Sequence, residues 1–164
     1  MKKKWMRFLL ITLSIAVLTV STAVLTGCAL RFEAVVFDDV PADMRFNFES
    51  KAFLFTNADE VENHIREYKT DAIQQPYYEK IETYDDKFFE KKSLVVLYYF
   101  DGSISSQISV KGIRYDNDVV TVLLSRKLPK YSATMVKECV VIVEMEKNEK
   151  ITSAGYKVEE RVTK

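Results

Sequence analysis

The residues that could do nucleophilic or acid-base chemistry are few and scattered along the chain. The sequence has one histidine, His64, and two cysteines, of which Cys139 stands at the head of an apolar run. A cysteine and a histidine can form a nucleophilic pair when they meet in space, but a cysteine inside a buried strand behaves as a small hydrophobic residue. We therefore expect Cys139 on a core face and His64 as a partly covered structural residue.

The other polar groups favour turns over catalysis. The serines of residues 103–106 stand in a loop with no lysine or histidine near them in sequence, which is typical of turn chemistry. Residues 116–118, Asp-Asn-Asp, lack the spacing and the terminal glutamate of a calcium loop. One histidine cannot build a His-rich metal site, and no nucleotide-binding or metalloprotease motif occurs. The sequence predicts no catalytic residues, no cofactor and no metal.

The strongest signal lies at the beginning of the chain. Lys2, Lys3, Lys4 and Arg7 precede an uncharged stretch from Phe8 to Thr26. A positive segment followed by an apolar one is the layout of a secretory signal. At 19 residues the stretch also fits a borderline transmembrane helix, so an uncleaved N-terminal anchor is the alternative.

The end of this stretch reads Leu25-Thr26-Gly27-Cys28, an aliphatic residue and two small residues before a cysteine. In this it resembles the lipobox of bacterial lipoproteins. The resemblance implies transfer of diacylglyceryl to the Cys28 thiol and cleavage between Gly27 and Cys28. Residues 1–27 are then a signal peptide, and residues 28–164 are held at the membrane through acylated Cys28. Both this interpretation and the uncleaved anchor place the rest of the chain on the extracytoplasmic face of the cell membrane or envelope.

The composition of residues 28–164, the part expected to be exported, excludes some classes of function. Without the four cations of residues 1–27, 20 Lys and Arg face 24 Asp and Glu. This mildly acidic balance argues against a nucleic-acid partner. The 137 exported residues suit a single domain that needs no disulfide, and acylation of Cys28 leaves Cys139 without an intramolecular partner.

The hydrophobic patterns predict an α+β fold. Asn57 and Glu60 suit the start of a helix over 58–69, and the apolar run 94–100 indicates a central strand covered on both faces. A change of parity at Gly112 indicates a β-bulge in a hairpin that turns at Asp116-Asn117. Further strands are expected over 139–145 and through Tyr156. Together these elements predict an antiparallel sheet of about five to seven strands with one main helix packed on it.

A second resemblance covers residues 57–146. Tyr84-Asp85, Phe88-Phe89 and the segment 92–97, followed by a loop and paired strands, resemble the C-terminal domain of the PrcB family. These are exported bacterial proteins named for a subunit that accompanies a surface protease. The resemblance implies a protein-associating accessory domain and no enzyme. The family's loop after the central strand usually reads Ser-Gly-Gly-Tyr, whereas this chain has Asp101-Gly102-Ser103.

Two segments are candidates for binding a partner. Tyr77 and Tyr78 follow Pro76 in what reads as an exposed loop, and exposed tyrosines are common at interfaces. Asp101, Gly102 and Ser103 open a small polar loop that we expect to be flexible. The leading hypothesis is a non-catalytic accessory lipoprotein that binds another envelope or secreted protein. The alternative is a solute- or glycan-binding lipoprotein whose aromatic pocket includes Tyr77 and Tyr78, and an envelope enzyme comes third.

Overall fold

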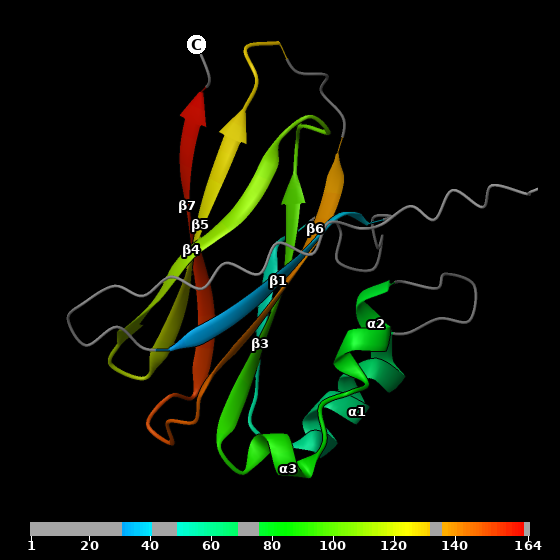
Figure 1. Cartoon of the computed structure of the whole chain (residues 1–164), viewed down its shortest axis with the longest axis vertical. Coiled ribbons are helices and arrows are strands. Elements are labelled where there is room, and N and C mark those ends of the chain that lie inside the picture. Colours follow the sequence, from blue (N-terminus) through cyan, green and yellow to red (C-terminus); the bar gives the residue numbers. More distant parts are fainter. Residues whose placement is uncertain (1–30, 41–48, 69–75, 132–135, 163–164) are drawn as a thin grey trace, which may run out of the picture.

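The fold is built from two β-sheets and a layer of short helices (Figure 1). The computed structural model describes residues 31–40, 49–68, 76–131 and 136–162, so residues 1–27 and Cys28 lie outside the described residues. Sheet A has the strand order β1-β6-β3-β2 and sheet B the order β4-β5-β7. The strands are β1 Phe32–Val40, β2 Lys51–Phe55, β3 Lys92–Asp101, β4 Gln107–Asp116, β5 Val119–Leu128, β6 Lys137–Glu146 and β7 Ser153–Val162; the helices are α1 Ala58–Tyr68, α2 Pro76–Ile81 and α3 Asp86–Phe89.

Sheet A is the middle layer, and both of its faces are covered. Successive strand residues point to opposite faces, and in β3 Leu94 and Val96 pack with the helices while Val95 and Leu97 pack with sheet B. Strand β6 divides its side chains in the same way. The run 94–100 therefore contains no polar residue because neither face of β3 meets water, which confirms the predicted central strand.

Sheet B contains the predicted hairpin. The register of β4 against β5 shifts between Val110 and Gly112, which confirms the expected bulge. Asn117 has a φ of 56° in the two-residue turn that follows β4, a conformation that asparagine tolerates better than most residues. Strand β7 then pairs with β5 in parallel, so this sheet is mixed.

The helices begin where the sequence offers caps. The backbone N–H of Glu60 donates to Asn57 Oδ1 at 2.9 Å, and the Glu60 carboxylate accepts from the N–H of Thr56 at 2.7 Å. Asp85 caps α3 by accepting from the N–H of Phe88 at 3.0 Å. Such caps satisfy the free N–H groups of a first helical turn. They fix the helix starts, so that Val61 and Phe89 are buried against sheet A.

The strands define two ends of the molecule. At the near end β1 starts, and Phe32 pairs with Met145, which also accepts a hydrogen bond from Tyr115 close to the hairpin turn of sheet B. At the far end β3, β5 and β7 finish, and β4 and β6 begin. The far end thus gathers the loop 102–106, the segments that flank residues 132–135, and Val162.

The predicted architecture is right in its sheet content and different in its arrangement. The described residues form seven strands and three short helices, but the strands make two sheets instead of one antiparallel sheet, and the three helices share one layer. The difference arises because the alternating apolar residues of the β4–β5 hairpin fit two arrangements equally well. They suit strands of one large sheet, and they also suit strands of a second sheet that packs on the first. Only the three-dimensional fold shows that the apolar face of the hairpin packs across Val95 and Leu97.

The prediction that Tyr77 and Tyr78 lie in an exposed loop is wrong. Pro76 begins α2 instead of breaking the chain, as a proline at the first helical position can. The two side chains are only 1% and 3% exposed. The Tyr77 ring lies 5.7 Å from that of Tyr98 and 6.4 Å from that of Phe37. These tyrosines therefore hold α2 on sheet A and offer no surface to a partner.

Replacing Tyr77 by Ala should lower the free energy of unfolding by about 3–5 kcal/mol, the usual loss for a buried aromatic side chain. Urea denaturation followed by circular dichroism measures the change. Tyr131→Ala is the matched control, because Tyr131 is 84% exposed and should change stability by less than about 0.5 kcal/mol. Equal stability of the two variants would contradict the placement of Tyr77 in the core.

Candidate functional site

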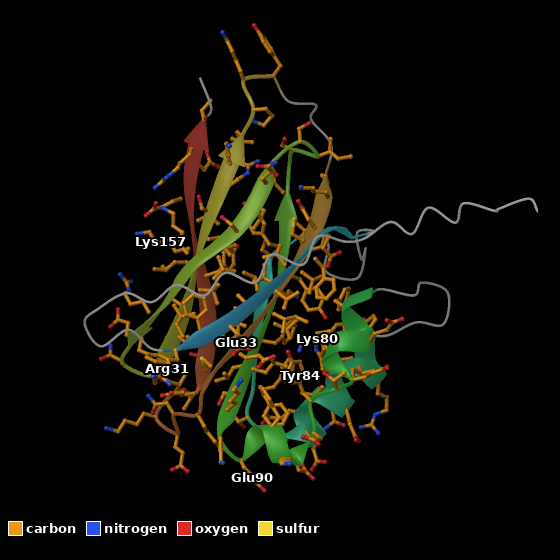
Figure 2. The ribbon with its side chains drawn as sticks, in the orientation of Figure 1. Arg31, Glu33, Lys80, Tyr84, Glu90 and Lys157 are labelled. Carbon is orange, nitrogen blue, oxygen red and sulfur yellow. The ribbon has the colours of Figure 1, made fainter. Side chains whose placement is uncertain are left out.

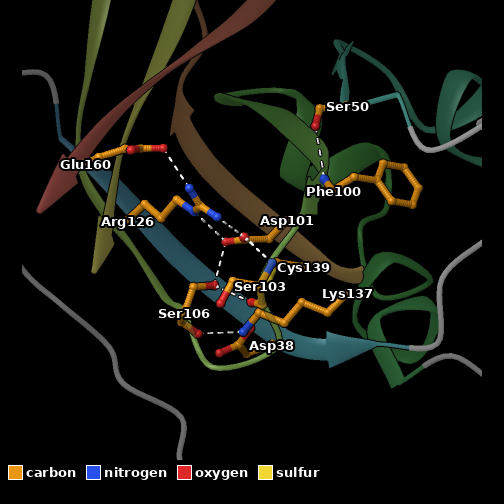
Figure 3. A network of polar contacts seen from close by, with 10 residues as sticks. All are labelled: Asp38, Ser50, Phe100, Asp101, Ser103, Ser106, Arg126, Lys137, Cys139 and Glu160. Carbon is orange, nitrogen blue, oxygen red and sulfur yellow. Dashed lines mark hydrogen bonds and ion pairs between the residues drawn. The ribbon is translucent and has the colours of Figure 1, made fainter. Parts of the chain in front are cut away.

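A buried carboxylate organises the far end of the fold. Asp101 is the last residue of β3, and both of its oxygens are occupied by donors from other segments (Figure 3). It accepts two hydrogen bonds from the Arg126 guanidinium, one of them 2.9 Å from Nε. The Ser106 hydroxyl donates to it at 2.5 Å, and the N–H of Ser103 donates at 2.9 Å. This single side chain therefore joins sheet A, sheet B and the loop between them.

The charges in this cluster stabilise each other. Burial by itself would raise the pKa of Asp101, but the hydrogen bonds from Arg126 and Ser106 outweigh burial and lower that pKa below its usual value. The same hydrogen bond raises the pKa of Arg126, whose guanidinium also donates to Glu160 at 2.6 Å. Burial, with the negative charge of Asp101 nearby, raises the pKa of the Tyr99 hydroxyl to about 12. Asp101 and Arg126 are consequently a charged pair at neutral pH.

A second set of polar contacts continues the cluster along β6. The Lys137 ammonium donates to Asp38 Oδ1 at 2.7 Å and to the carbonyl oxygen of Ser106 at 2.6 Å. The Cys139 thiol donates to the same Asp38 oxygen at 2.9 Å. Lys137 is almost fully buried, and its positive charge is paired with the more exposed carboxylate of Asp38. Cys139 lies on a core face, as expected, and is inaccessible from solvent.

The loop 102–106 is held by this cluster and does not have the open, flexible character predicted for it. Asp101 binds the loop at Ser103 and Ser106, and Lys137 binds the Ser106 carbonyl group. Ser103 and Ser106 are buried, whereas Gly102 and Ile104 are exposed. Of the predicted binding residues, Asp101 and Ser103 are therefore internal supports, and Gly102 alone faces solvent.

The far end also carries most of the large apolar side chains that are exposed among the described residues. Ile104, Tyr131, Val136 and Val162 are 38%, 84%, 51% and 67% exposed, and all four belong to segments of the far end. Tyr156, in the middle of β7, is the fifth large hydrophobic residue of this kind among those described. Large apolar side chains that cluster on a surface are typical of interaction sites. We call Ile104, Tyr131, Val136 and Val162 the tip cluster.

Sequence reasoning missed the charged supports of this end. Arg126 follows Val120, Val122 and Leu124 at the same strand parity, and Lys137 shares parity with Cys139. A cation that continues the inward parity of an apolar strand is a signal that the strand end carries a buried ion pair. The pairing partners Asp38 and Asp101 come from other strands, so no spacing in the sequence could identify them.

The remaining candidate residues from the sequence are His64, Gly27 and Cys28. His64 is buried in α1, and its Nε2 lies 2.8 Å from the Tyr98 hydroxyl oxygen, with the rings of Phe53 and Phe55 around it. It packs on the face of sheet A opposite to that of Cys139, so the sheet separates the His64 ring from the thiol. Gly27 and Cys28 lie outside the described residues. Among those described, no group of His, Cys, Asp and Glu is placed to hold a metal ion.

The chain has no match among family models, curated proteins or solved structures. The resemblance to the PrcB domain therefore stays a prediction from residues 57–146. Within the part of the chain that the structure describes, no helix has the length and apolar character needed to cross a membrane. The described site must consequently be interpreted from its own geometry.

Replacing Asp101 by Asn should destabilise the fold by about 2–4 kcal/mol, because it leaves the cation of Arg126 poorly paired. The lowered pKa of Asp101 means that the wild-type contribution is complete above the unfolded-state pKa. It is lost as pH falls through the folded-state pKa. The variant should therefore lose less stability than wild type on acidification below about pH 4.

Urea unfolding at several pH values measures both effects. Glu160→Gln is the control, since Glu160 is exposed and bonded to the same arginine, and exposed ion pairs contribute at most about 1 kcal/mol. An Asp101→Asn variant as stable as Glu160→Gln would show that the far end does not depend on the buried pair.

Proposed function

We propose that the chain is a lipid-anchored, extracytoplasmic protein that acts as a non-catalytic protein-binding module. The lipobox at residues 25–28 supports the anchor. Only residues 29–31 separate Cys28 from the start of β1, and four residue steps reach at most about 14 Å. An acyl chain on Cys28 therefore holds the near end of the fold next to the membrane and leaves the far end clear of the anchor.

The tip cluster is the observation that carries the binding function. Its four exposed apolar side chains stand at the end of the strands opposite Phe32. Water contact with such side chains is unfavourable, by roughly 25 cal/mol for each Å² of apolar surface. A protein partner that covers this end would remove that surface from water. Tyr131 is an especially suitable contact, because tyrosine brings a large area with few rotatable bonds.

The polar cluster beneath the tip makes this surface rigid. Asp101 and Lys137 fix both ends of the segment that presents Ile104. A loop that is ordered before binding loses less conformational entropy when a partner arrives. The buried charges are thus best understood as supports for a recognition surface. Ser103, Ser106 and Cys139 are covered by the surrounding chain, whereas Ser105 of the same loop is exposed.

A solute- or glycan-binding function has less support. It depended on Tyr77 and Tyr78 as an aromatic pocket, and both are buried in the core. A cavity of about 260 Å³ between β1 and α2 is lined by Phe37 and Tyr84 among others. This cavity is below the roughly 300–1,000 Å³ usual for small-molecule sites. Two hollows of about 460 and 480 Å³ fall within that range, but neither is lined by Tyr77 or Tyr78. The accessory role implied by the PrcB resemblance agrees with a protein partner.

Replacing Cys28 by Ala should block lipid attachment and leave a longer precursor that retains residues 1–27. Intact-mass spectrometry of the membrane fraction tests this directly. The wild-type protein should begin at Cys28 and carry the added mass of its acyl chains. The control is Cys139→Ala, which removes the other cysteine and should be processed like wild type. An unmodified wild-type chain that still begins at Met1 would exclude lipidation and leave the uncleaved anchor.

A photo-crosslinking amino acid placed at position 104 or 131 should join the protein to one and the same envelope protein in intact cells. The same probe at position 156 is the matched control, because Ile104 and Tyr156 are both 38% exposed but only Ile104 belongs to the tip cluster. Crosslinked products are identified by mass spectrometry. Equal yields from positions 104 and 156, or no product from 104 and 131, would exclude the tip cluster as the interface.

A further inference from the structure

Opposite sides of the molecule carry opposite charge. The helical segments 58–68 and 76–90 contain nine acids and three cations. The outer face of sheet B, which points away from sheet A, instead carries five cations, Lys111, Arg114, Lys127, Lys157 and Arg161, and two acids, Asp116 and Glu159. In Figure 2 Lys157 is labelled at the left beside β7, and Glu90 at the bottom below α3. We call this outer surface the basic face.

The register of sheet B places these cations on one surface. Lys127 stands beside Arg161, and Arg114 stands beside Thr121. Along β5 the positions of the outer face alternate with Val120, Val122 and Leu124, which point inward. Glu159 is paired with Lys111. None of the ion pairs between described residues involves Arg114, Lys127, Lys157 or Arg161, although Arg161 and Lys157 interact electrostatically with Glu159 from a greater distance. All four cations can therefore meet an external anion.

The chemistry of the basic face suits a broad anionic surface better than a protein. Protein interfaces are enriched in aromatic residues at their centre, whereas the middle of this face consists of Thr121, Ser125, Gly112, Gly155 and Leu123. Hydroxyl groups and small residues leave the surrounding Lys and Arg side chains free to reach phosphate groups. Lys and Arg are the side chains that recognise phosphate most strongly.

We infer that the basic face rests on the anionic phospholipid headgroups of the membrane that anchors the protein, which gives the domain one preferred orientation. This inference depends on the proposed lipidation of Cys28. The anchor lies at the near end of sheet B, because Phe32 of β1 pairs with Met145, and Tyr115 of β4 donates a hydrogen bond to the sulfur of Met145. Once the chain is tethered, contact with the membrane becomes an intramolecular event with a high effective concentration.

The orientation follows from how charge acts near a membrane. Each Lys or Arg close to an anionic surface adds roughly fivefold to its preference for that surface. The attraction fades within a Debye length of about 8 Å, so only the face in contact contributes. Resting on sheet B brings the cations to the headgroups and turns the acidic helices outward. The reverse orientation would press the nine acids of the helical segments against anionic lipid.

Lysine labelling on vesicles tests the orientation. The full-length acylated protein is reconstituted in phosphatidylcholine vesicles, with or without roughly a third phosphatidylglycerol, and labelled briefly with a membrane-impermeant amine reagent. Mass spectrometry gives the rate for each lysine. With the anionic lipid, Lys127 and Lys157 should react at least ~3-fold more slowly, and Lys87 of α3 should be unchanged. About 0.5 M NaCl should remove the difference, because salt screens it.

Arginine variants separate this contact from other causes. Arg114→Glu combined with Arg161→Glu keeps both lysine reporters and should abolish the protection, whereas Arg66→Glu on α1 should preserve it. Equal labelling of Lys127 and Lys157 in the two vesicle types would overturn the inference. Protection that also appears in neutral vesicles and grows with protein density would overturn it in favour of a second copy docking through its acidic helices.

The same samples distinguish failure of the anchor from failure of the orientation. Intact mass shows whether Cys28 carries acyl chains, and sedimentation with neutral vesicles shows whether those chains hold the protein. An acylated protein with unprotected Lys127 and Lys157 would contradict the inference and leave the proposed anchor intact. A protein without acyl chains would contradict the proposed anchor, and its labelling on anionic vesicles would still decide whether the basic face binds headgroups.

Discussion

The burial of sheet A on both faces is the constraint on which the rest of the fold depends. Strands β3 and β6 expose almost no side chain, so their two apolar faces each require a cover. The helices cover one face and sheet B covers the other. A buried aliphatic side chain contributes roughly 1.5–3 kcal/mol. The loss of either layer would therefore expose a row of such residues at once, and both layers must form for the central sheet to persist.

This three-layer arrangement decides where function can lie. The interior is filled by aromatic and aliphatic side chains, and the one histidine belongs to that interior. Polar groups that could recognise a partner are left to the strand ends and the outer faces. At the far end Asp101 forms an ion pair with Arg126, and Lys137 forms one with Asp38. Buried ion pairs seldom increase stability over apolar packing, but they can specify one geometry, which suits the support of a recognition loop.

The predictable parts of the structure are those set by local pattern. The run 94–100, the cap at Asn57 and the bulge at Gly112 follow from rules about neighbouring residues, and the structure confirms each. The division into two sheets depends on contacts between distant strands. Parallel pairing of β7 with β5 brings together residues that are far apart in sequence, and hydrophobic parity does not reveal which strand will be the neighbour.

The error at Tyr77 and Tyr78 has a specific physical origin. Proline is compatible with a loop and equally with the first turn of a helix, and the sequence around Pro76 offers no cap that decides between them. Core packing decides: the Tyr77 ring lies against the rings of Tyr98 and Phe37, and the Tyr78 ring lies against that of Tyr77. Aromatic residues next to a proline thus indicate an exposed loop only where other side chains already fill the core. Here the face of sheet A turned to the helices is not covered by α1 alone, so α2 is drawn inward.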